Sequence, residues 1–121
     1  AVGNEGPQAP PQYPAAYDNV VGVTAVDTKH RVYLYANQGA YVDFAAPGVD
    51  AEVANPGGAS DTASGTSYAA PIVAAAFARL VDRPDKAQAD AAMKTLSGRA
   101  RDLGKPGRDP VYGHGLIVMD R

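Results

Sequence analysis

A serine stands at the head of an alanine-rich apolar segment, in residues 65–71, Gly-Thr-Ser-Tyr-Ala-Ala-Pro. At the start of a helix, unpaired backbone N–H groups and the positive end of the helix dipole favour developing negative charge. The hydroxyl of Ser67 could therefore act as a nucleophile on a carbonyl carbon, which is the chemistry of acyl transfer. A bare Gly-Thr-Ser is more simply interpreted as a helix N-cap, because Ser and Thr are preferred there. The longer context decides between the two interpretations.

Residues 65–71 as a whole resemble the nucleophile motif of subtilisin-like serine peptidases, in which Gly-Thr-Ser is followed by any residue, Ala, a small residue and Pro. Four further segments resemble motifs of the same family, in the same order: residues 1–6, its oxyanion segment; residues 13–17, followed by a core strand; residues 46–48, its Ala-Pro-Gly turn; and residues 112–117, its closing segment. Five ordered motifs cover nearly all of the chain. The sequence is therefore identified as a member of this family.

The resemblance assigns roles to particular residues. Ser67 would attack a peptide carbonyl, and the Asn4 amide with a backbone N–H near Ser67 would stabilise the resulting oxyanion. Val2 and Gly3 would form part of the pocket for the substrate's primary side chain, with Glu5 at its rim, so that basic side chains would be tolerated. The reaction implied is hydrolysis of a peptide bond in a polypeptide substrate, with no cofactor.

Serine catalysis also needs a general base and a carboxylate that orients it. In this family the Asp and the His come before the Ser, so both would precede Ala1. Residues 1–121 are therefore expected to be the C-terminal part of a peptidase domain that begins upstream. His30, His114, Asp27 and Asp43 match neither catalytic position, and both histidines are expected to be surface or packing residues.

Two further comparisons with the family concern the cleft and a metal. Tyr68 stands where several members have Met, and it would narrow the leaving-group side of the cleft. One carboxylate and three backbone carbonyls resemble the family's weak cation site: Asp43, Ala15, Tyr17 and Val20. A single carboxylate is thin support for calcium, and no metal site is predicted.

The remaining sequence predicts the elements that must position these residues. Residues 20–26 are a β-branched run without polar alternation, typical of a strand buried on both faces, and residues 42–46 predict a second strand. Residues 50–64 predict mostly loop with room for a hairpin. Helices are predicted over 66–81, with Pro71 in or near the first turn, and over 84–97, ended by Gly98. This order of elements predicts the α/β fold class, and the resemblance implies a partial subtilisin-like fold with a mostly parallel sheet flanked by helices.

Composition excludes several functions. The 11 Lys and Arg against 13 Asp and Glu give a net charge of −2, without a basic stripe for nucleic acid. The longest apolar run is far shorter than the roughly 20 residues that span a bilayer. There is no cysteine. Secretion or a cell-envelope location is expected from the family resemblance alone.

Two other classes of protein compete with this prediction. An α/β-hydrolase needs a core strand directly before its serine elbow, and residues 57–64 do not form one. The chain could also be an inactive fragment, or an interaction module of peptidase ancestry. If the peptidase prediction holds, the isolated chain should be inactive. It should then depend on an N-terminal companion chain, or on self-association, to cover its exposed surfaces.

Overall fold

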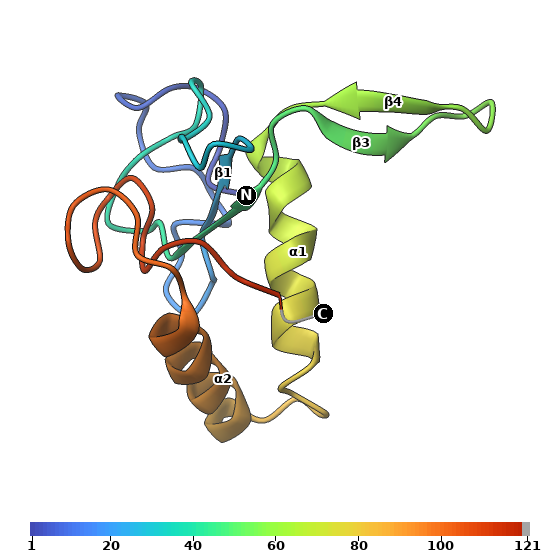
Figure 1. Ribbon diagram of the computed structural model, residues 1–121. Coiled ribbons are helices and arrows are strands. Elements are labelled where there is room, and N and C mark those ends of the chain that lie inside the picture. Colours follow the sequence, from blue (N-terminus) through green and yellow to red (C-terminus); the bar gives the residue numbers. More distant parts are fainter. Residues whose placement is uncertain (120–121) are drawn as a thin grey trace.

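A computed structural model describes residues 1–119 (Figure 1). The elements follow in the order β1 (Val23–Val26), β2 (Phe44–Pro47), β3 (Ala51–Ala54), β4 (Ser60–Ala63), α1 (Thr66–Ala78) and α2 (Lys86–Arg99). Strands β1 and β2 form one two-stranded sheet, and β3 and β4 form another. The chain is thus α/β, as predicted, with two helices and short sheets.

Strands β1 and β2 pair in parallel, with Val23 opposite Phe44 and Val26 opposite Pro47. All four residues of β1 are buried, which agrees with a strand covered on both faces. Residues 20–22 do not continue the strand, contrary to the prediction. At that point the Gly22 N–H donates to the Asp43 carboxylate at 2.8 Å, and both Asp43 N–H and Phe44 N–H donate to the Gly22 carbonyl.

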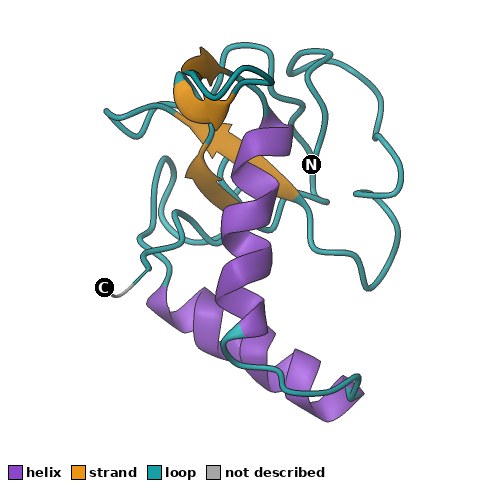
Figure 2. Cartoon of the chain, turned by 90° about the vertical axis from the view of Figure 1, so that its right-hand side faces the viewer, coloured by secondary structure: helices purple, strands orange, loops and turns teal. Residues whose placement is uncertain are grey.

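Helix α1 packs against both β1 and β2 (Figure 2). Val73 and Ala76 are buried in the core, and Ile72 and Phe77 pack against it. These are the residues whose spacing marks one helical face. The helix ends at Ala78, before the predicted 81, where the chain tightens into a turn in which the Leu80 N–H donates to the Phe77 carbonyl three residues back.

The opposite face of α1 is exposed, although the apolar residues of 66–81 predict a largely buried helix. Ser67, Pro71, Ala74, Ala75 and Ala78 lie on that face. Pro71 lies inside the helix rather than in its first turn. Because proline has no N–H, the Ser67 carbonyl receives no helical hydrogen bond from residue 71.

Helix α2 begins two residues later than predicted and ends two residues later. Asp85 is its N-cap, with the Asp85 carboxylate accepting from the Gln88 N–H at 3.0 Å. Such a cap is the usual role of an aspartate at this position. Gly98 lies within the last turn and does not stop the helix, which ends where Ala100 adopts an extended conformation.

Residues 50–64, predicted as mostly loop with room for a hairpin, contain the hairpin β3 and β4, an antiparallel pair with Ala51 opposite Ala63. It projects away from the rest of the molecule beside the start of α1 (Figure 1). The expected mostly parallel sheet is therefore replaced, in residues 1–119, by one parallel pair and one separate hairpin. Of the two helices, α1 packs on the parallel pair, whereas α2 packs on α1 and adds Leu96 to the core.

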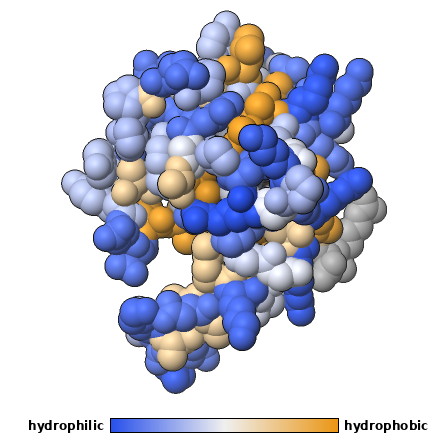
Figure 3. Space-filling model, turned by 90° about the vertical axis from the view of Figure 1, so that its left-hand side faces the viewer, coloured by the Kyte–Doolittle hydropathy of each residue, from blue (hydrophilic) through white to orange (hydrophobic). Residues whose placement is uncertain are grey.

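One side of the molecule is hollowed between α2 and the body above it (Figure 3). The groove there has a volume of about 560 Å³ and combines apolar Val20, Val21, Phe77 and Met93 with charged Asp43, Lys86 and Asp90. Within residues 1–119, neither helix is long and apolar enough to cross a membrane.

Candidate active site

Asn4 lies against the first turn of α1, although 62 residues separate it from Thr66. The Asn4 carbonyl oxygen, Oδ1, accepts the Thr66 N–H at 2.9 Å and the Thr66 hydroxyl at 3.0 Å. With Oδ1 committed in this way, the amide nitrogen Nδ2 is left as the outward donor, and no hydrogen bond joins it to another group of residues 1–119. The structure thus places an amide donor beside the residue that precedes Ser67.

Thr66 links the two segments in both directions. Its hydroxyl donates to Asn4 and accepts the Gly3 N–H at 3.2 Å, and its side chain is fully buried. Sequence reasoning assigned Thr66 only a possible capping role. In the structure the N-cap of α1 is Gly65, with no side-chain cap, and Thr66 instead orients Asn4.

Ser67 follows Thr66 in the first turn of α1 and is exposed. The end of β2 positions this turn, because the Gly65 N–H donates to the Gly48 carbonyl at 2.8 Å. A methyl group on Gly48 would lie 2.8 Å from the Gly65 carbonyl oxygen, so the strand and the helix approach as closely as their backbones allow. The serine hydroxyl therefore sits at the carboxyl edge of the parallel pair, at a helix N-terminus that favours negative charge.

Asn37 fixes the segment that carries Asn4. Its side chain is fully buried, although the polar residues within 27–40 predict a surface excursion. The Asn37 N–H donates to the Gly3 carbonyl at 3.1 Å, and Oδ1 accepts the Glu5 N–H at 2.8 Å. Gly3 has φ 113°, a left-handed conformation that favours glycine. An Asn in a polar stretch carries no sequence signal of such a role.

The three expected pocket residues differ in accessibility. Val2 is fully buried and packs with Ala15 and Val42, so its side chain belongs to the core. Gly3 is half-buried, with its N–H and carbonyl both engaged. Glu5 is exposed. A substrate could reach Glu5 and the backbone around Gly3, but not the side chain of Val2.

No histidine or carboxylate of residues 1–119 is hydrogen-bonded to Ser67. The His114 N–H donates to the Asp43 carbonyl at 2.7 Å, just before β2, whereas Ser67 lies beyond the other end of β2. The five residue steps from Asp43 to Gly48, at about 3.3 Å each, separate these two positions by roughly 16 Å. His30 lies in the turn after β1, where its own N–H donates to the Asp27 carbonyl.

The carboxylates of Asp27 and Asp43 are engaged in hydrogen bonds and ion pairs with other residues. The Asp27 carboxylate accepts the Lys29 and Arg31 N–H groups and pairs with the Arg31 guanidinium. The hydrogen bond from the Arg31 backbone is the main cause that lowers the Asp27 pKa. Asp43 pairs with Arg108 at 2.9 Å and accepts from Gly22. Neither carboxylate orients a histidine, and residues 1–119 contain no cluster of three side chains suited to a metal.

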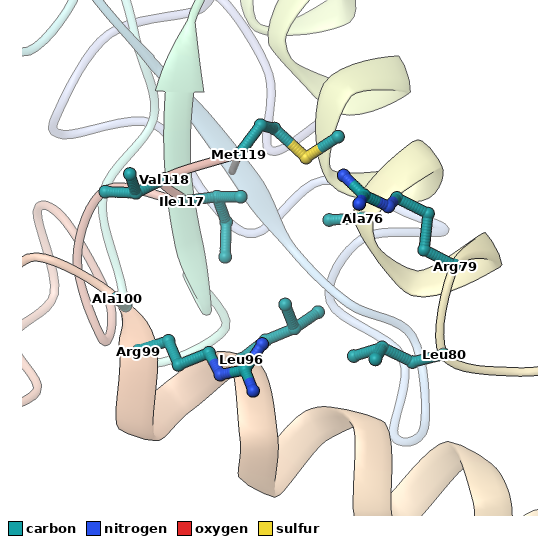
Figure 4. A pocket seen from close by; sticks show the side chains of 9 residues that line it. All are labelled: Ala76, Arg79, Leu80, Leu96, Arg99, Ala100, Ile117, Val118 and Met119. Atoms are coloured by element: carbon teal, nitrogen blue, oxygen red, sulfur yellow. The ribbon is translucent and has the colours of Figure 1, made fainter. Parts of the chain in front are cut away.

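A small cavity of about 160 Å³ lies at the far end of α1 from Ser67, between that helix, α2 and the C-terminal segment (Figure 4). Leu80, Leu96 and Ile117 form its apolar part, with Arg79 and Arg99 on either side. Its distance from Ser67 and Asn4 separates it from the candidate active site.

Comparison with known proteins shows the same family at the level of the whole chain and of individual relatives. The pattern of the Subtilase family, peptidase S8, matches residues 1–115. The chain is 39% identical to Minor extracellular protease Epr of Bacillus subtilis over 97% of this chain and 18% of that protein. It is 35% identical to Subtilisin DY of Bacillus licheniformis over 98% of this chain and 42% of that protein.

Among solved structures, a crystal structure of a lanthipeptide protease superposes with a TM-score of 0.76 and 26% identity. The match covers 87% of this chain and 42% of that one. The 121 residues thus span less than half the length of each of these three proteins.

Proposed function

Because the chain belongs to the subtilase family of serine peptidases, we propose that it supplies the nucleophile and the oxyanion donor of a peptide-hydrolysing active site. Ser67 Oγ attacks the carbonyl carbon of the scissile bond, and the carbonyl oxygen becomes an oxyanion. The Asn4 amide and a backbone N–H at the start of α1 donate to that oxygen.

The observation that carries this proposal is the pair of hydrogen bonds from Thr66 to Asn4 Oδ1. They fix which end of the amide faces outward, and a fixed donor needs no reorganisation as charge develops.

The other half of the site is proposed to lie in the N-terminal part of the same domain, upstream of residue 1. A neutral serine hydroxyl is a weak nucleophile and needs a general base within hydrogen-bond reach. Neither His30 nor His114 is bonded to Ser67, and this chain matches 42% of Subtilisin DY. Residues 1–121 are accordingly assigned as the C-terminal part of the peptidase domain.

On the substrate side, Glu5 and the backbone near Gly3 would line the primary pocket, and polypeptides are the substrates that the family implies. The exposed carboxylate of Glu5 would tolerate a basic side chain. An export route is proposed on the same basis, because Epr of Bacillus subtilis is named as an extracellular protease.

Fluorophosphonate labelling tests the proposal most directly. The chain alone should label negligibly and hydrolyse no peptide. Co-expression with the upstream part of the same peptidase should produce labelling that Ser67→Ala abolishes. Robust turnover by the verified isolated chain, lost on Ser67→Ala, would contradict the division of the site and give His30 or His114 a catalytic role.

Asn4→Ala in the completed peptidase tests the oxyanion donor. We expect kcat to fall by about two to three orders of magnitude with little change in KM, the signature of an interaction made in the transition state. That magnitude, about 2.7–4 kcal/mol, is the one known for subtilisin itself rather than one obtained from this geometry. An unchanged kcat would remove Asn4 from the oxyanion site.

A second candidate function is that of a non-catalytic interaction module. The absence of a base bonded to Ser67 within residues 1–119, together with the exposed face of α1, favours it. The two candidates separate in the labelling experiment, because a module would bind the upstream part without making Ser67 reactive.

A further inference from the structure

The oxygens around Asp43 hold a guanidinium nitrogen in the way that a cation site holds an ion. Arg108 Nη2 lies 2.8 Å from the Ala40 carbonyl, 2.9 Å from Asp43 Oδ1 and 3.4 Å from the Val42 carbonyl. One nitrogen with two hydrogens therefore faces three oxygens. Charge attraction to a small oxygen cluster explains this arrangement better than paired, directional hydrogen bonds do.

Asp43 is the member of this cluster that most needs a cation. Its side chain is 14% exposed, and within residues 1–119 its other oxygen, Oδ2, accepts only the Gly22 N–H. A carboxylate withdrawn from water is costly unless it is paired. Through its backbone, Asp43 also accepts the His114 N–H at 2.7 Å and donates to Gly22. The charge at Asp43 thus lies where β1, β2 and the C-terminal segment meet.

The cluster opens into a cavity of about 360 Å³ lined in part by Ala15, Tyr17, Val20 and Asp43. These are the residues that resemble the weak cation site of the family. A calcium ion takes six to eight oxygen ligands, including carbonyls and water. The cavity offers space and oxygens for such a site, and Asp18 lines it as well as Asp43. Arg108, however, already pairs with Asp43, the carboxylate that belongs to the oxygen cluster. The residues therefore do not fit a bound metal while Arg108 is in place.

We propose that the Arg108 guanidinium is a built-in cation that replaces a metal ion at the Asp43 oxygen cluster, and that removing the guanidinium creates a site for a calcium-like ion. An arginine attached to the chain neutralises Asp43 at any metal concentration. The junction of β1, β2 and the C-terminal segment would then hold without free calcium. This inference does not depend on the proposed catalytic role.

Terbium luminescence tests the proposal on the full chain. Terbium(III) is an oxygen-seeking probe of calcium sites, and it is sensitised by nearby tyrosine. Tyr17 and Tyr41 line the cavity, and the chain has no tryptophan. Arg108→Met should bind calcium, measured by displacement of terbium, with a Kd of about 10⁻⁴ to 10⁻³ M, the range of weak extracellular sites. The unsubstituted chain should bind about tenfold more weakly or not at all.

Two variants make the result specific. Arg108→Met with Asp43→Asn should lose the new site, since the carboxylate is its anionic ligand. Arg31→Met removes a comparable arginine–aspartate pair, whose partner Asp27 lies outside this cavity, and should gain no site.

Three results would overturn the proposal. The first is terbium binding by the unsubstituted chain that is as tight as that of Arg108→Met and that Asp43→Asn abolishes. The second is an Arg108→Met chain with native circular dichroism that binds no more terbium than the unsubstituted chain does. The third applies if Arg108→Met does not fold: millimolar calcium should restore its helical signal, and failure to do so would contradict the replacement of an ion by Arg108.

Discussion

At the scale of single residues, the candidate site depends on the anchoring of one amide. Thr66 both donates to Asn4 Oδ1 and accepts from Gly3 N–H. It therefore couples the segment that carries the oxyanion donor to the turn that carries the nucleophile. Neither Asn4 nor Ser67 could hold the other in place, because both are exposed.

Thr66→Val tests this coupling in the completed peptidase. The substitution keeps the side-chain shape but removes a hydrogen bond to Asn4 and leaves the Gly3 N–H without its acceptor. A hydrogen bond worth about 1 kcal/mol predicts a loss of roughly three- to tenfold in kcat, with KM little changed. Thr66→Ser keeps the hydroxyl and should retain most of the activity. Equal losses in both variants would show that packing, not the hydroxyl, is important.

His114 gives the fold a predictable pH dependence. Burial first, and the nearby Arg108 second, lower the His114 pKa below its ordinary value of 6.5, while Asp43 opposes them. The unfolded chain therefore takes up this proton at a higher pH than the folded chain does. The contribution of neutral His114 to the free energy of unfolding should be fully present above pH 6.5 and fall as the pH drops through 6.5. It should level off below the lowered pKa.

Two measurements check this expectation. NMR titration of the His114 ring should give a midpoint below 6.5. His114→Gln should flatten the change in unfolding free energy over that pH range. A midpoint at or above 6.5 would contradict the expected effect of burial.

The sequence predicted the approach of Asn4 to the first turn of α1 only through recognised motifs. Local propensity would have made Asn4 a turn residue and Ser67 a cap. Thr66, Asn37 and Arg108 were not predicted as positioning residues, because their partners are 27 to 68 positions away. Partners so distant in sequence leave no periodic or local pattern.

At the scale of elements, the presence of each helix and strand was predicted better than its first and last residues. The run of residues 20–26 indicated a buried strand, but hydrogen bonds between Gly22 and Asp43 restrict β1 to Val23–Val26. Asp85 capped α2 where Pro84 had been expected to start it. Each change of boundary is caused by a hydrogen bond, either to a residue distant in sequence or to a capping side chain, that outweighs local propensity.

The contact between β2 and α1 is the element-scale feature that sets the position of Ser67. Gly48→Ala should destabilise the fold by about 1–3 kcal/mol. The added methyl group would lie 2.8 Å from both the Ala25 Cβ and the Gly65 carbonyl oxygen, and 3.1 Å from the Ala69 Cβ. Urea unfolding would measure the loss.

Gly57→Ala, at the hairpin tip, is the matched control, because nothing lies within 4 Å of the added methyl group. Its stability should be close to that of the unsubstituted chain. Comparable losses at both positions would indicate a general cost of replacing glycine rather than a close approach at Gly48.

At the scale of the whole molecule, the parallel pair has an open side. Among residues 1–119, only two backbone hydrogen bonds reach the outer edge of β1: the Val2 N–H donates to the Val23 carbonyl, and the Tyr33 N–H donates to the Ala25 carbonyl. Gly22 and Val26 accept from the β2 side, so the N–H groups of Val23 and Ala25 point away from β2. Within residues 1–119 these two N–H groups have no backbone acceptor.

Apolar surface adds to this open edge. One face of α1 is exposed, and Leu34 and Tyr35 are 76% and 57% exposed. Open strand edges and apolar patches both favour association with another chain.

We therefore expect the isolated chain to self-associate and the upstream part of the peptidase to replace that association with a defined complex. Sedimentation velocity should show species heavier than the 12.4 kDa monomer. Ala74→Lys, on the exposed face of α1, should weaken the association, because it places a charge on the apolar surface. Ala91→Lys, on the exposed face of α2, changes the charge equally and should leave it intact. A compact 12.4 kDa monomer with a cooperative melt would instead show that this part of the fold is stable without a partner.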